Sequence, residues 1–126
     1  ARARGKNVIL DVDTIGAMKI RALCPDATLV YILPPSWDEL KSRLSSTGIY
    51  NKEEVNTLME IAEEEISCAN SYDYILVNDT ISNTLSRFAQ IIHSNRYSRN
   101  CMKEFLDSYI DGEVKPHVQS YKEALL

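Results

Sequence analysis

The sequence has 126 residues with 44% hydrophobic and 25% charged side chains, a composition typical of a soluble globular protein. Its net charge of −4 argues against a dedicated nucleic-acid binder, which usually carries a basic face. No apolar run approaches the ~18 residues of a transmembrane helix, so no membrane partner is predicted. The first residue is not Met, so we expect a trimmed chain or one that begins inside a longer protein.

The three cysteines are far apart and form no CxxC pair. They are Cys24, Cys68 and Cys101. This spacing excludes a recognisable zinc site or disulfide framework. It predicts reduced thiols and a cytoplasmic protein.

Strands and helices alternate along the chain. The predicted elements are a strand over 8–10, a helix over 16–23, a strand over 28–33, a helix over 36–45, a helix over 51–69, a strand over 74–77, and helices around 85–92 and over 99–110. Residues 113–126 are expected to form a short polar tail with some helix. This order predicts an α/β fold with a parallel sheet and right-handed crossovers.

Polar residues follow two of the three predicted strands. Asp11 and Asp13 end the first strand, and Asn78 and Asp79 follow the third. In parallel sheets ligands bind beyond the carboxyl ends of the strands, so we expect a functional site at this edge. The two acidic residues could serve a magnesium–nucleotide site, or they could cap the next helix or pair with a lysine.

Other charged residues also leave alternatives open. Arg43 precedes a Ser-Ser-Thr-Gly loop, where it could swing over phosphates or remain a solvated side chain. The two histidines have no ligand-like spacing. A modest basic cluster is interpreted as a solvated or subunit-contact face; its members are Arg87, Arg96, Arg99 and Lys103.

Three blocks of sequence together resemble the guanylate kinase family. Residues 8–17 (VILDVDTIGA) are similar to the family's ILDID-x-QGA segment. Residues 33–44 resemble its APPS…EL…RL stretch, and residues 63–79 resemble its EEL…FDYVIVND ending. The blocks keep the family's order and approximate spacing from residue 6 to about 93.

The resemblance implies a fold and an activity. Guanylate kinases transfer the terminal phosphate of ATP to GMP with Mg²⁺, giving ADP and GDP. The chain would hold a partial parallel-sheet P-loop kinase-like core over residues 1–94. This core would include a helical lid over about 42–58. Residues 95–126 would form a C-terminal helical extension, a candidate surface for homo-oligomer formation.

The resemblance also implies roles for single residues. Asp11 would be catalytic and would hold Mg²⁺ indirectly, through water. Asp13 would contact the GMP base or its binding network. Arg43 would be a catalytic lid arginine lying against the adenine and phosphates. Asn78 would face the adenine ring, and Asp79 would belong to the same ATP site.

The sequence departs from the family in ways that affect catalysis. The P-loop motif G-x-x-x-x-G-K-[ST] and the GMP-binding part are absent. Thr47, Thr57 and Leu58 replace basic lid residues, and Ile15 replaces a glutamine. We therefore expect this chain alone to be inactive. Its parent is either a guanylate kinase or a non-catalytic module that binds a protein.

Loss of the P-loop strand has a structural consequence as well. The family's sheet would lack its central strand, which would expose an apolar slot. A second chain, a swapped segment or further residues are candidates to fill it.

Overall fold

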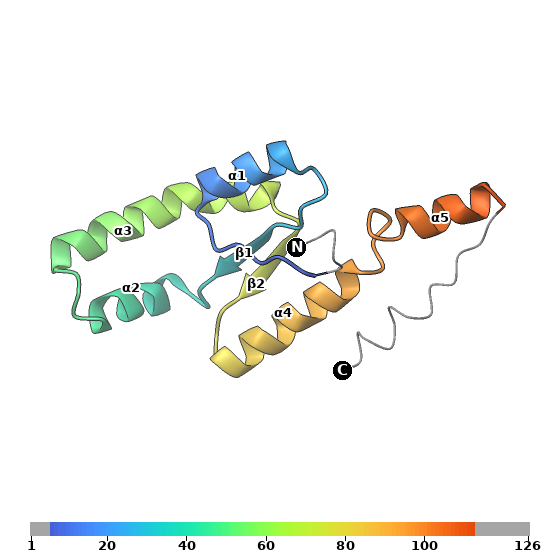
Figure 1. Cartoon of the computed structure of the whole chain (residues 1–126). Coiled ribbons are helices and arrows are strands. Elements are labelled where there is room, and N and C mark those ends of the chain that lie inside the picture. Colours follow the sequence, from blue (N-terminus) through green and yellow to red (C-terminus); the bar gives the residue numbers. More distant parts are fainter. Residues whose placement is uncertain (1–5, 113–126) are drawn as a thin grey trace.

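The computed structural model describes residues 6–112 (Figure 1). Helices flank a very small sheet. The α-helices follow one another along the chain in the order that the sequence predicts. The elements are α1 (Thr14–Leu23), β1 (Val30–Leu33), α2 (Trp37–Ser46), α3 (Lys52–Glu65), the 3-10 helix η2 (Ile66–Ser71), β2 (Tyr74–Val77), α4 (Ile81–Asn95) and α5 (Lys103–Ile110). None of these helices is long and apolar enough to cross a membrane.

The two strands confirm the predicted parallel arrangement. β1 and β2 are paired in parallel, in a register that runs from Val30 opposite Tyr74 to Leu33 opposite Val77. The pairing extends one residue further, since the Asn78 N–H donates to the Leu33 carbonyl at 2.7 Å. α2 and α3 therefore belong to the crossover connection between two parallel strands.

The predicted strand over residues 8–10 is wrong for this structure. Residues 6–13 form an elongated segment without regular secondary structure that leads into α1 (Figure 1). A strand requires a hydrogen-bonded neighbour, and none of the described residues supplies one to this segment. The apolar side chains of Val8, Ile9, Leu10 and Val12 consequently remain 45% to 65% exposed.

Both α2 and α3 begin directly after an N-cap residue whose side chain accepts a backbone hydrogen bond. Asn51 and Glu54 form the complete capping box expected before α3. Before α2 only half of the expected box is present: the Ser36 hydroxyl accepts from the Glu39 N–H at 3.1 Å. The Glu39 carboxylate instead accepts from Arg43, one helical turn further on.

The end of α3 differs from the sequence prediction, whereas the end of α5 agrees with it. α3 ends at Glu65, and the chain continues as the 3-10 helix η2 instead of an α-helix to residue 69. Gly112 has φ of 79°, a conformation that favours glycine and agrees with the predicted break after α5. The polar tail predicted over 113–126 lies outside the described residues.

One acidic side chain joins three elements at the amino-terminal edge of the sheet. An Asp73 carboxylate oxygen accepts from Arg21 of α1 at 2.6 Å and from the backbone N–H of Leu29 at 2.7 Å. At the same edge, the Thr28 hydroxyl donates to Asn95 at the end of α4 at 2.9 Å. These bonds fix α1 and α4 relative to the strands.

The buried core is small for the length of the chain. Among the described residues the buried hydrophobic side chains are Ala17, Leu29, Val55, Ala69 and Leu76. Ile32 and Ile75, which lie within the strands, remain 54% and 57% exposed. Parallel sheets are normally covered on both faces, so much of the surface of this sheet lacks its usual cover.

Candidate functional site

The carboxyl ends of the two strands meet at one edge of the sheet. Figure 1 shows β1 leading to the start of α2, and β2 leading to the start of α4, on the same side of the molecule. The N–H groups at the beginnings of two helices therefore lie near this edge. This is the edge that the sequence predicts as functional, although only two of the three predicted strands form among the described residues.

Arg43 crosses from α2 to the end of β2. Its Nη1 and Nη2 groups donate to the carbonyls of Asn78 and Asp79 at 2.9 and 3.1 Å. Its Nε donates to Glu39 at 2.8 Å. The side chain is thus anchored by three hydrogen bonds, in contrast to the freely swinging arginine that the sequence left as one alternative. Two of its five N–H donors have no partner among the described residues.

Asp79 is held by neighbours on α4. Its carboxylate accepts from the Thr80 N–H at 2.7 Å and from Asn83 at 3.4 Å, and it pairs with Arg87 at 3.0 Å. The hydrogen bond from the Thr80 backbone, followed by those from Arg87 and Asn83, lowers the pKa of Asp79. The carboxylate therefore helps to fix the beginning of α4.

Asn78 keeps part of its side chain available. Its Oδ1 accepts from the Thr84 hydroxyl at 3.0 Å. This bond orients the amide, and its NH₂ group donates to no other group within residues 6–112. An oriented amide with spare donors suits the edge of a heteroaromatic base.

The two acidic residues of the first segment have different surroundings. Asp13 is the N-cap of α1, and its carboxylate accepts from the Gly16 N–H at 2.7 Å. The capping alternative is therefore confirmed for Asp13. Asp11 is exposed and makes no hydrogen bond or ion pair with the residues that the structure describes.

A water-held magnesium ion fits this donor set better than a directly ligated one. Within residues 6–112 no three acidic, cysteine or histidine side chains gather as metal ligands. Mg²⁺ retains several waters and commonly uses only one or two protein carboxylates together with substrate phosphates. Asp11 offers one carboxylate that has no partner among residues 6–112, which matches that mode.

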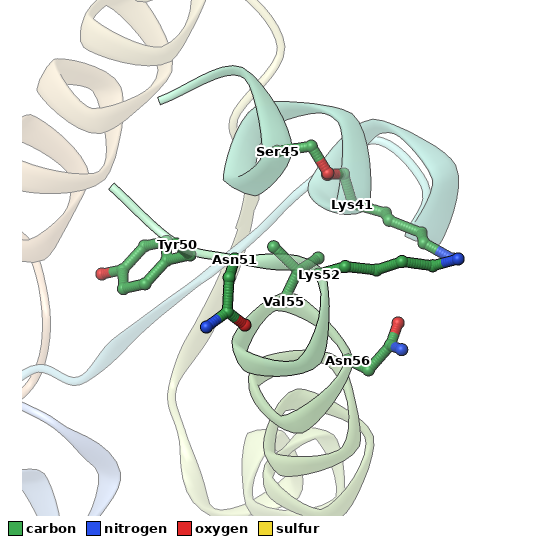
Figure 2. A pocket seen from close by; sticks show the side chains of 7 residues that line it. All are labelled: Lys41, Ser45, Tyr50, Asn51, Lys52, Val55 and Asn56. Carbon is green, nitrogen blue, oxygen red and sulfur yellow. The ribbon is translucent and has the colours of Figure 1, made fainter. Parts of the chain in front are cut away.

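A pocket of about 250 Å³ lies between α2 and α3. It is lined by Lys41, Ser45, Tyr50, Asn51, Lys52, Val55 and Asn56. Figure 2 shows the lysine side chains from the two helices extending in the same direction. Sequence reasoning missed this pocket because the lysines, eleven positions apart, come together only through the turn between the helices.

The structure therefore joins only some of the predicted site residues. It links Arg43 to Asn78 and Asp79, whereas no described contact connects Asp11 or Asp13 with these three. Arg87 was interpreted as part of a basic surface cluster, although it pairs with Asp79. The separation of eight positions, two helical turns into α4, is the only sequence signal that points to this pair.

Comparisons with known proteins identify the family to which the chain is similar. The guanylate kinase family model matches residues 1–95. A guanylate kinase from Francisella tularensis is 46% identical over 94 residues, which are 74% of this chain and 50% of that protein. Those from Clostridium acetobutylicum and Thermus thermophilus are 35% and 36% identical, over 93% and 85% of this chain and 55% and 49% of those proteins.

The extent of these matches shows the family to which the chain belongs. The chain spans about half the length of the curated relatives it matches. The family model nevertheless covers most of this chain, including both strands and the residues at their carboxyl ends. The chain belongs to the guanylate kinase family.

Proposed function

We propose that the protein to which this chain belongs transfers the terminal phosphate of ATP to GMP, giving ADP and GDP. The observation that carries the proposal is the Arg43 guanidinium, which donates to the carbonyls of Asn78 and Asp79 at the ligand-binding edge of the sheet. This arrangement places a cation and an oriented amide beside one another. Such a pair suits a nucleotide, which has a heteroaromatic base and an anionic phosphate chain.

The described residues suggest a division of roles. Asn78 would donate its free amide hydrogens to the adenine, and Arg43 would lie against the same nucleotide with its remaining donors. Asp13 would stay at the start of α1 and contribute to the network around GMP. Asp11 would hold water molecules of a bound Mg²⁺. The ion, when bound, would neutralise charge on the phosphate oxygens.

We also propose that this chain alone does not turn over. Phosphoryl transfer depends almost entirely on positioning and on electrostatic stabilisation of the transferring group. The sequence has no P-loop motif, and threonine or leucine stands at lid positions where basic residues are expected. An arginine of this type can contribute about 10³–10⁵ in rate.

A non-catalytic, protein-binding module is the second candidate. Thr47 and Leu58 favour it, because both remove positive charge from the segment expected to cover the phosphates. The contact between Arg43 and Asn78, together with the carboxylate of Asp11 in the sequence, favours the enzyme, because binding a protein requires no such set of groups. Nucleotide binding separates the two candidates.

The deciding experiment measures ADP release with ATP, GMP and Mg²⁺. The full-length gene product and this 126-residue chain are assayed side by side, and circular dichroism verifies that both are folded. We expect turnover only from the full-length protein. Asp11→Asn in that protein should reduce kcat, whereas Lys19→Gln, an exposed change on α1, should leave kcat unchanged. Absence of turnover and of nucleotide binding in folded full-length protein would support the protein-binding module.

A further inference from the structure

The open pocket between α2 and α3 differs in charge from the rest of the chain. Two of its seven lining residues are lysines, one from each helix, and none of the seven is acidic. By contrast, α3 alone contains six glutamates, and the whole chain has 18 acidic against 14 basic side chains. A pocket that is lined by two cations and by no carboxylate favours an anionic ligand.

The polar groups on one side of this pocket are available to such a ligand. The ammonium groups of Lys41 and Lys52 form no ion pair with a described residue. Figure 2 shows both lysine side chains and Asn56 extending to the same side of the pocket, whereas Tyr50 points to the opposite side. The Asn56 amide adds two N–H donors. Two positive charges and an amide can therefore serve one anion.

Lys52 stands where a cation is unfavourable for the helix itself. It is the first residue of α3, directly after the N-cap Asn51. The amino-terminal end of a helix carries partial positive charge, so a basic side chain destabilises it. The capping box at this end consists of Asn51 and Glu54, and Lys52 takes no part in it. Its charge does not serve the helix, but it would serve an anion bound beside the helix start.

The pocket lies on a different face of α2 from the edge that is proposed to bind the nucleotide. Lys41 precedes Arg43 by two positions, which places the two side chains about 200° apart around the helix axis. Arg43 reaches the carbonyls that follow β2, whereas Lys41 lines the pocket together with residues of α3. The groups assigned to ATP and GMP are therefore not the groups that line this pocket.

We propose that the pocket between α2 and α3 binds a small anion that carries phosphate, held by the ammonium groups of Lys41 and Lys52 and by the amide of Asn56. Lysine binds phosphate as a point charge, and two lysines match a doubly charged phosphate group. The pocket volume of about 250 Å³ is below the roughly 300–1,000 Å³ of sites for larger organic ligands, which favours a phosphate or short polyphosphate group. Such an anion would bridge the two helices.

The test titrates the 126-residue chain with inorganic tripolyphosphate at constant ionic strength. NMR follows the backbone amide signals, and inorganic phosphate and ATP are titrated in parallel. We expect saturable shifts at Lys41, Lys52 and Asn56. ATP should shift the same signals with an affinity similar to that of tripolyphosphate, because the phosphate chain is the recognised group. Shifts that appear only with ATP, and only around Arg43 and Asn78, overturn the proposal.

Matched lysine variants make the test specific to the pocket. Lys41→Gln and Lys52→Gln should each weaken the binding of tripolyphosphate about fivefold. Lys19→Gln, at an exposed lysine on α1, is the control and should bind like the unchanged chain.

Lys52→Gln has a second expected signature. Without added anion, its urea unfolding midpoint should not fall, because the substitution removes a cation from the helix start. The increase in midpoint that tripolyphosphate causes in the unchanged chain should shrink in this variant. Together the two readings distinguish a loss of binding from a loss of folding.

Two further results would overturn the proposal. One is the absence of saturable shifts with tripolyphosphate at constant ionic strength. The other is equal weakening of binding by Lys19→Gln, Lys41→Gln and Lys52→Gln, because the anion would then be attracted by the overall charge and not by the pocket. The inference is additional to the proposed phosphoryl transfer. Failure of the full-length protein to release ADP would contradict the proposed function and leave this site standing.

Discussion

At the scale of single residues, Arg43 has more partners than a residue reserved for a ligand would need. It reaches from α2 to two carbonyls that follow β2 and also pairs with Glu39. Hydrogen bonds from a charged donor to backbone carbonyls stabilise a protein more than neutral ones do. Arg43 therefore connects the helix to the strand end whether or not a nucleotide is present.

Replacing Arg43 should lower the stability of the protein even when no substrate is bound. Arg43→Gln is expected to lower the free energy of unfolding by about 1 kcal/mol, a value below the usual range for hydrogen bonds to charged groups because the side chain is 37% exposed. Urea unfolding followed by circular dichroism measures the change. Lys19→Gln removes a positive charge that has no hydrogen bond to a described residue, and is the control. An equal effect of both variants would contradict the anchoring role.

The lowered pKa of Asp79 predicts how the stability of the protein depends on pH. Its pKa is lowered in the folded protein, first by the hydrogen bond from Thr80 and then by those from Arg87 and Asn83. The stabilisation is therefore complete above the unfolded pKa, about 3.9, and is lost as the pH falls through the lower folded value. Asp79→Asn should be less stable than the unchanged chain at pH 7, and the difference should shrink below about pH 4.

The measurement is a series of urea unfolding curves between pH 7 and pH 2. Asp26→Asn serves as the control, because Asp26 is exposed and has no hydrogen bond or ion pair with a described residue. The assigned role of Asp79 fails if the stability difference between Asp79→Asn and the unchanged chain is the same across this range.

Sequence patterns identified the residues of the candidate site better than they identified the hydrogen-bond partners of these residues. Arg43, Asn78 and Asp79 were predicted to share a site, and the structure brings them together. The sequence could not show that Arg43 bonds to backbone carbonyls 35 and 36 positions away, because such bonds depend on how the crossover returns to the sheet. Local rules sufficed for Asp13, whose partner lies three residues away.

At the scale of elements, the start of α3 is the best-defined local feature. Asn51 accepts from the Glu54 N–H at 2.9 Å, and Glu54 accepts from the Asn51 N–H at 2.7 Å. Asn51→Ala should therefore lower the free energy of unfolding by about 1 kcal/mol. The same substitution at Asn56, inside the helix, should be neutral or slightly stabilising because alanine has the higher helix propensity.

Thermal and urea unfolding of these two variants provides a contrast in sign. The chemical change is identical, and only the position relative to the helix start differs. Destabilisation of similar size at Asn51 and Asn56 would show that the capping box does not control α3.

Element prediction failed where a strand needs a distant partner. Tyr74–Val77 was predicted with the bounds that the structure has, and β2 is paired with β1. Residues 8–10 have equally strong strand composition but no neighbour within the described chain. Composition reports the preference of a segment, whereas pairing depends on whether the rest of the sheet is present.

At the scale of the whole molecule, the small core should affect cooperativity. The urea m-value increases with the surface that unfolding exposes, and few large side chains are buried among the described residues. We expect a shallow transition for this chain alone, with m below about 1 kcal/mol/M, the lower end for small proteins. A steep transition in the monomeric chain alone would show that the core is larger than the structure indicates.

The anchoring of Arg43 also determines where the segment over residues 42–58 can bend. Its hydrogen bonds attach the middle of α2 to the end of β2, so a swing that preserves them must begin beyond this residue. The next position whose backbone conformation favours glycine is Gly48, with φ of 68° in the turn between α2 and α3. We predict that a lid motion of this segment begins in the turn at Gly48, while the middle of α2 stays attached to the end of β2.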